Sequence, residues 1–141
     1  MTAAIRIVLL GLILGAAATP VIAQATPRQR PTGVTDSAIS RGKALFHGSA
    51  RCDRCHGLGG RGTPYGPDLA DAIWWHGPGS YDWLVREVSH GIPANLTVTG
   101  DPMPAGEQMN LSEAEVRAVA AYVWAISHPA KPPLARVPEP S

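Results

Sequence analysis

Residues 52–56 read Cys52-Asp53-Arg54-Cys55-His56, a C-x-x-C-H motif that contains both cysteines of the 141-residue chain. Residues three and four positions apart share one face of a helix, so Cys52, Cys55 and His56 can point the same way. Two thiols on that face can bond the two vinyl groups at one edge of a haem, while the imidazole reaches the iron. C-x-x-C-H is the attachment motif of c-type haem. It predicts one covalently bound haem c per chain, with Cys52, Cys55 and His56 as its first site residues.

Three other uses of two closely spaced cysteines remain open at this point. A structural zinc site needs four ligands, and the remaining histidines show no H-x₃₋₅-H spacing. A thioredoxin-like dithiol belongs in a βαβ unit, whereas the flanks here are helical and Gly-rich. A disulfide across a two-residue gap would stabilise the fold little through loop closure. The four histidines outside the motif are His47, His76, His90 and His128.

The first 25 residues have the layout of a secretory signal peptide. A short segment with one charge, Arg6, precedes an apolar run over residues 7–18 that Pro20 interrupts. That run is too short to cross a bilayer, which takes about 20 apolar residues. We expect cleavage near Ala23 or Ala25, export to the periplasm, and no integral membrane span after cleavage.

The charge of the chain is nearly balanced. It has 12 Lys+Arg and 11 Asp+Glu, and removing the leader takes away one arginine and no acid. Neither nucleic-acid binding nor a polybasic membrane surface is indicated, and no nucleic-acid partner is expected. The remaining ~115 residues suit one small domain with a modest apolar core. A bound haem would supply much of its buried apolar surface, so the apo-protein should fold poorly.

Three main helices are predicted. The first has Thr35 or Asp36 as its N-cap and runs to about His47. The second spans residues 81–90, with Ser80 as its cap. The third follows Ser112, which forms a capping box with Glu115, and it ends at His128 before a proline.

Loops connect these helices. Residues 57–67 are rich in Gly and Pro and are expected as loop, because neither helix nor strand tolerates that composition. A short helix is expected around residues 68–75, and residues 92–108 read as loop. No segment shows a convincing strand pattern. Residues 26–34 are expected to be a flexible lead-in, residues 35–128 the folded domain and residues 129–141 a Pro-rich disordered tail.

Five short segments between about Ser37 and His128 resemble, in their sequences and in their order along the chain, those of class I c-type cytochromes, the monohaem electron carriers. The resemblance implies an all-α, cytochrome c-like fold of three to five helices wrapped around one haem. It also implies that the first and last helices cross at Gly42 and Tyr122. The segments are Arg41-Gly42-Lys43-Ala44-Leu45-Phe46, Cys52-Asp53-Arg54-Cys55-His56-Gly57, Tyr65-Gly66-Pro67-Asp68-Leu69, Pro102-Met103-Pro104 and Ala120-Ala121-Tyr122-Val123.

The resemblance implies that His56 and a methionine from the loop before the last helix are the axial ligands of the iron. Met103 fits, and its flanking prolines would stiffen the loop. Met109 is the rival, although it lies only three residues before Ser112. A histidine or an open position is the third option. The Pro67 carbonyl is expected to accept a hydrogen bond from His56 Nδ1–H and so to fix the ring.

The sequence therefore predicts a periplasmic electron carrier that transfers single electrons and is not itself an enzyme. Its partners would be redox proteins, such as a dehydrogenase, an oxidase or a bc1-type complex. The alternative is an electron-transfer subunit bound permanently in a multi-subunit periplasmic dehydrogenase or sulfur-oxidising complex. A haem enzyme or gas sensor with an open iron position is a third hypothesis.

Four tryptophans are many for so small a domain. Each is a candidate for lining the haem pocket or for ordinary core packing. They are Trp74, Trp75, Trp83 and Trp124.

Overall fold

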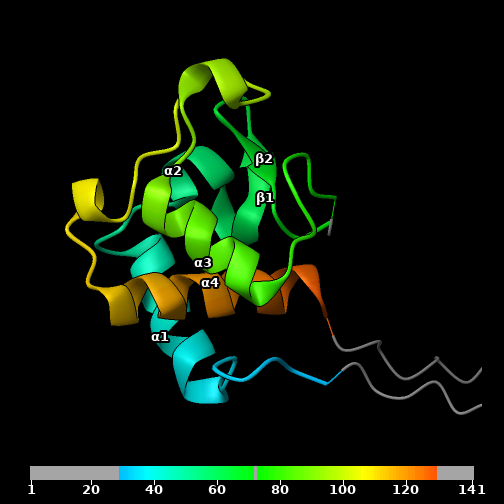
Figure 1. Cartoon of the computed structure of the whole chain (residues 1–141), viewed down its shortest axis with the longest axis vertical. Helices are drawn as coiled ribbons and strands as arrows, with labels where there is room; N and C mark the ends of the chain where they lie inside the picture. Colours follow the sequence, from blue (N-terminus) through cyan, green and yellow to red (C-terminus); the bar gives the residue numbers. More distant parts are fainter. Residues whose placement is uncertain (1–28, 72, 130–141) are drawn as a thin grey trace, which may run out of the picture.

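The computed structural model describes residues 29–71 and 73–129 (Figure 1). Within them the chain forms four α-helices, three short 3-10 helices and one two-stranded hairpin. The mainly helical fold expected from the sequence is confirmed, and its helix number lies in the expected range. The elements are α1 (Asp36–His47), α2 (Asp53–His56), η1 (Leu58–Gly60), β1 (Arg61–Thr63), β2 (Gly66–Asp68), α3 (Tyr81–His90), η2 (Ala94–Leu96), η3 (Glu107–Met109) and α4 (Glu113–Ser127).

The long helices begin at the caps that the sequence predicted. Thr35 Oγ1 accepts from the Ala38 amide at 3.1 Å, so Thr35 is the N-cap of α1. Ser80 caps α3 through the Trp83 amide. Such caps satisfy amides that the first helical turn leaves without an intrahelical partner.

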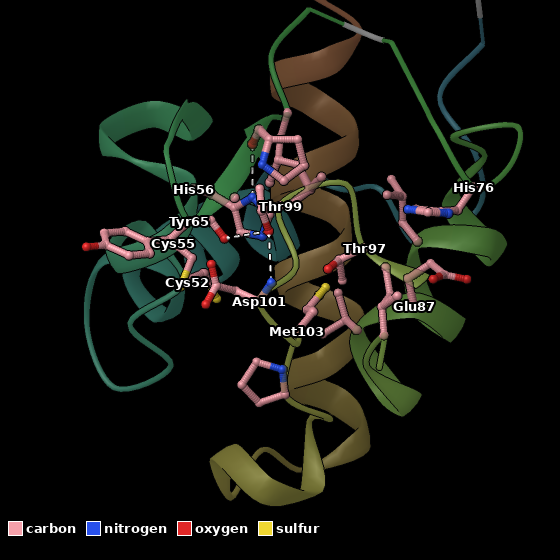
Figure 2. Close-up of a pocket in the computed structure, with 18 of the residues that line it drawn as sticks. Cys52, Cys55, His56, Tyr65, His76, Glu87, Thr97, Thr99, Asp101 and Met103 are labelled. Carbon is pink, nitrogen blue, oxygen red and sulfur yellow. Dashed lines mark hydrogen bonds between the residues drawn. The ribbon is translucent and has the colours of Figure 1, made fainter. Parts of the chain in front are cut away.

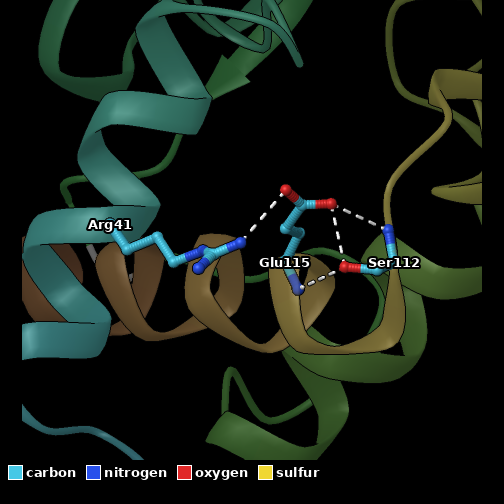
Figure 3. A network of polar contacts seen from close by, with 3 residues as sticks. All are labelled: Arg41, Ser112 and Glu115. Atoms are coloured by element: carbon cyan, nitrogen blue, oxygen red, sulfur yellow. Dashed lines mark hydrogen bonds and ion pairs between the residues drawn. The ribbon is translucent and has the colours of Figure 1, made fainter.

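The capping box of α4 is also present. Ser112 Oγ accepts from the Glu115 amide at 3.4 Å, and Glu115 accepts from the Ser112 amide at 3.0 Å. Figure 3 shows that Glu115 also accepts from Arg41 of α1, at 3.2 Å. Glu115, which completes the cap of α4, therefore also ties this helix to α1.

α1 crosses α4 (Figure 1), and Gly42 lies where the two helices touch. A Cβ at this position would lie 1.9 Å from the Ala118 carbonyl oxygen and 2.9 Å from Tyr122 Cβ. Only a residue without a side chain lets the two backbones approach this closely. The expected crossing at Gly42 and Tyr122 is confirmed.

The core lies where α1, α3 and α4 meet. Residues of α4 supply much of it, and Phe46 and Val119 are almost completely buried. Val34 is also buried, so core packing begins before the predicted start of α1. The core residues are Val34, Phe46, Tyr81, Trp83, Leu84, Val88, Val116, Val119, Ala120, Ala121, Tyr122, Val123 and Trp124.

Two local expectations were wrong. Residues 57–67, which were expected to be loop, contain β1 and most of β2. The two strands pair antiparallel, with Arg61 opposite Asp68 and Thr63 opposite Gly66. The short helix expected around residues 68–75 does not form among its described residues, where bends follow β2. There the side chains of Asp68 and Asp71 accept from amides two residues ahead, as in Asx turns. Such turns compete locally with helix formation.

No helix in the described part of the chain is both long and apolar enough to cross a membrane. The predicted leader, residues 1–25, lies outside the described residues, as does the tail from residue 130 onward.

Candidate functional site

The short helix α2 carries the C-x-x-C-H motif. Cys52 is its N-cap, and its carbonyl accepts from the amides of Cys55 at 3.2 Å and His56 at 2.9 Å. This single helical turn places the two thiols and the imidazole along one face, as their spacing predicted. Gly57 then ends the helix with a positive φ of 74° and turns the chain into the hairpin.

The ring of His56 is held from the hairpin. Its Nδ1 lies 3.0 Å from the Pro67 carbonyl oxygen, so the expected contact between these residues is present. A carbonyl only accepts, so Nδ1 carries the hydrogen and Nε2 keeps its lone pair for another partner. Burial lowers the pKa of His56, opposed by the bond to Pro67, and therefore favours the neutral ring that can ligate a metal.

A cavity of about 320 Å³ opens in front of this face. α2 and the hairpin form one wall, and the loop that follows α3 forms another (Figure 2). The lining is mostly apolar, and α1, α3 and α4 contribute the deeper side chains. These deeper side chains are Phe46, Leu84, Val88, Val119 and Val123.

Met103 lies on the second wall, with its sulfur inside the cavity (Figure 2). Its backbone is fixed by two hydrogen bonds with Ile92, each 2.9 Å long. Met109 also lines the cavity but sits at the end of η3. Both methionines named from the sequence therefore line the space in front of His56. The Met103 backbone bonds Ile92 through both its amide and its carbonyl, whereas the Met109 amide bonds the carbonyls of Ala105 and Gly106.

The sequence profile of the Cytochrome c family matches residues 39–127, which include the C-x-x-C-H helix, the cavity walls and α4. The chain belongs to the cytochrome c family. The match covers more than half of the chain and both walls of the cavity.

Two curated relatives of this cytochrome are subunits of cbb3-type cytochrome c oxidases. Subunit FixPc of Rhizobium leguminosarum bv. viciae is 33% identical over 107 residues, which are 74% of this chain and 36% of that protein. Subunit FixP of Bradyrhizobium sp. (strain ORS 278) is 32% identical over 92 residues, 64% of this chain and 31% of that protein. The chain thus spans about a third of the length of these relatives.

Two crystal structures share the fold of this cytochrome. The c-type cytochrome XoxG of Methylobacterium extorquens AM1 aligns with a TM-score of 0.50 at 24% identity, over 66% of this chain and 52% of that one. Cytochrome CL of Methylophaga aminisulfidivorans MPT aligns with a TM-score of 0.52 at 24% identity, over 67% and 59% of the two chains.

The donor set and the cavity of this cytochrome fit a haem. Both thiols are free and half-buried beside the cavity, as thioether formation requires. A neutral imidazole nitrogen and a soft thioether occupy walls of the same apolar space, and both are known haem-iron ligands. An apolar lining also suits the large, mostly apolar face of a porphyrin.

The alternatives for the two cysteines find no such support. Within residues 29–71 and 73–129, no group of three His, Cys, Asp or Glu side chains is placed to hold a metal ion such as zinc. Burial, opposed by a backbone hydrogen bond, raises the pKa of Cys52 to about 11, whereas redox-active dithiols have lowered pKa values. The two sulfurs form no disulfide.

Three of the four tryptophans line the cavity. Trp74 and Trp83 pack edge to face with ring centres 5.5 Å apart, and Trp75 is exposed at the rim. Trp124 instead lies in the core of the cytochrome, where it stacks on His128. His76 lines the cavity, whereas His90 is exposed and bonds a carbonyl of its own helix.

Sequence reasoning missed a histidine bridge beneath the attachment helix. His47, at the end of α1, has Nδ1 3.1 Å from Asp53 Oδ2 and Nε2 3.3 Å from the Tyr122 hydroxyl. It therefore joins α1, α2 and α4 at a residue inside the C-x-x-C-H motif. Its position as the last residue of a predicted helix was the only signal in the sequence.

Sequence reasoning missed much of the polar part of the lining. Acidic and basic groups are mixed there, so the cavity does not carry a single sign of charge. The residues it missed include Glu87, Thr97, Thr99 and Asp101, which line the cavity together with Arg51, Arg54 and Asp68.

Proposed function

We propose that this cytochrome is a monohaem electron carrier, with haem c bound covalently to Cys52 and Cys55 and its iron ligated by His56 and Met103. One observation carries the proposal: an imidazole anchored to Pro67 and the thioether of Met103 occupy two walls of one apolar cavity that both motif thiols border. The haem would supply the reversible Fe(III)/Fe(II) couple.

The protein side chains would set the properties of that couple. The bond from Nδ1–H to the Pro67 carbonyl keeps His56 in one tautomer and makes Nε2 a better donor. The neutral, soft thioether of Met103 favours the ferrous state relative to a second imidazole. The apolar lining disfavours the more highly charged ferric state and raises the potential further.

Two protein ligands leave no iron position for oxygen, peroxide or a substrate. This supports an electron carrier without enzymatic activity of its own, in preference to an oxidising enzyme or a gas sensor. Rapid binding of carbon monoxide to the reduced protein would contradict this ligand set.

Visible spectra of the purified ferric and ferrous protein test the proposal. We expect low-spin spectra in both states, a haem that stays with the polypeptide after denaturation, and the far-red ferric band of a methionine–iron bond. The matched control is the double variant Cys52→Ser/Cys55→Ser, which should lose its haem on acid extraction. A colourless exported protein, or haem that extracts equally from both proteins, would refute it.

We also propose that the chain is exported to the periplasm and that its leader is removed near Ala23 or Ala25. The apolar run with its small-x-small site supports this placement, as does the C-x-x-C-H motif, because c-type haem is attached outside the bacterial cytoplasm. Intact mass spectrometry of periplasmic protein should give the shortened chain plus one haem. A cytoplasmic, full-length product would refute export.

A second candidate is an electron-transfer subunit bound permanently in a larger complex. It is supported by the curated relatives, which are named as oxidase subunits and are about three times longer than the matched region. The partner would be an oxidase, a dehydrogenase or a sulfur-oxidising complex. Size-exclusion chromatography of native extract, followed at the haem absorbance, separates the candidates. Elution as a small monomer favours the free carrier, and co-elution with a large enzyme favours the subunit.

A further inference from the structure

A chain of hydrogen bonds runs from the wall that carries His56 to the wall that carries Met103. Thr63 Oγ1 donates to the Cys55 carbonyl at 2.6 Å and accepts from the Tyr65 amide at 3.0 Å. The Tyr65 carbonyl then accepts from Thr99 Oγ1 at 3.5 Å, and Thr99 Oγ1 accepts from the Asp101 amide at 3.3 Å. We call Thr63, the Tyr65 peptide groups and Thr99 the threonine strap.

The strap reaches the methionine wall in the loop between Ile92 and Met103. The two bonds between Ile92 and Met103 close the base of the loop, and residues 93–102 project beyond them. This projection is largely exposed, including Leu96 and Val98. Among the described residues, the Thr97 hydroxyl bonds only within the projection, where it donates to the Ala94 carbonyl and accepts from the Gly100 amide.

Thr99 is therefore the link from the projection to the hairpin beside α2. Figure 2 shows Tyr65, Thr99 and Asp101 joined in this way at one side of the cavity, with Met103 two residues farther along the chain. Opening the bond at Thr99 would free the projection to move, and this motion would act on Met103, the residue that closes its base with Ile92.

We propose that the threonine strap is a positioning device: it holds the Met103 wall at a fixed separation from the His56 wall and thereby slows departure of the thioether from the iron. The inference rests on the proposed function, because it needs Met103 as a ligand. Thr63 and Thr99 are positioning residues and not iron ligands. They act through the backbone of the two walls.

The test is the rate at which cyanide replaces methionine in the ferric holoprotein. Cyanide can bind only after the thioether leaves, so the rate reports opening of the loop. The variant Thr99→Val keeps the shape of the side chain and removes the hydroxyl. The matched control is Thr97→Val, the same change in the same loop at a threonine whose bonds stay inside it. Tyr65→Phe is a second control, because it leaves the carbonyl used by the strap in place.

Each threonine variant loses two side-chain hydrogen bonds, but only Thr99→Val loses one that crosses to the hairpin. Loss of that one bond corresponds to a factor of about two to ten in an opening equilibrium. We therefore expect cyanide to bind Thr99→Val about two to ten times faster than Thr97→Val, with the Tyr65→Phe rate close to wild type. Equal rates in the two threonine variants would overturn the strap.

Amide hydrogen exchange of residues 97–103 gives a second readout that does not use the iron's reactivity. Thr63→Val, which cuts the strap at its other end, should raise exchange of this segment as Thr99→Val does. Unchanged exchange there in both variants, with haem content and helicity at wild-type levels, would also overturn the strap. Failure of the proposed function looks different, because wild-type ferric protein would then lack the methionine–iron band before any substitution is made.

Discussion

Replacing Gly42 by alanine should force α1 and α4 apart at their crossing. The new Cβ would lie 1.9 Å from the Ala118 carbonyl oxygen, where ordinary contact begins near 3.4 Å. The helices would have to separate locally by about 1.5 Å, and close-packed interiors resist such a shift. The obstacle is backbone of α4, so no side-chain rotation can relieve it.

The expected cost follows from two opposed effects. Overpacking a core costs about 1–3 kcal/mol, and a backbone obstacle places Gly42→Ala at the upper end. Alanine is a better helix former than glycine by about 1 kcal/mol, which offsets part of this. The net loss is about 2 kcal/mol, or roughly 10 °C in Tm for a domain of this size.

Urea and thermal unfolding of the holoprotein, followed by circular dichroism, measure this loss. Ala44→Gly is the control, because Ala44 is an exposed position of α1 where the change alters helix propensity alone. It should cost about 1 kcal/mol. Should Gly42→Ala prove as stable as wild type or more so, the close crossing of α1 and α4 would be wrong.

Three further predictions concern the site and its supports. Met103→Leu should abolish the methionine–iron band and admit cyanide rapidly, whereas Met109→Leu should keep the wild-type spectrum; the reverse result would make Met109 the ligand. His47→Leu should cost about 1–2 kcal/mol in urea unfolding, because its partners on α2 and α4 lose a hydrogen bond each, and an unchanged midpoint would contradict the bridge. The Ser112 amide and hydroxyl lower the pKa of Glu115 from 4.5. The ionised carboxylate therefore stabilises the fold above pH 4.5, and this stability is lost as the pH falls through the lower folded-state pKa. In a stability–pH profile, Glu115→Gln should therefore lose less stability than wild type at acid pH. Equal losses in the two proteins would refute the prediction.

The sequence correctly predicted the structural features whose cause is local or chemical. Caps at Thr35, Ser80 and Ser112 satisfy amides three residues away, so their signals lie within one helical turn. It failed at β1 and β2, because a hairpin of two three-residue strands leaves too short a pattern to read. It failed also around residues 68–75, where the aspartates bond nearby amides instead of leaving them to a helix.

The motif at residues 52–56 by itself named the cofactor, because two thiols and an imidazole one turn apart have few chemical uses. The meeting of both walls across the cavity was decided by the tertiary structure alone. The His47 bridge spans 75 residues to Tyr122, and the Thr99 bond spans 34 residues to Tyr65. Such contacts depend on how the helices pack, and side-chain spacing along the chain carries no record of it.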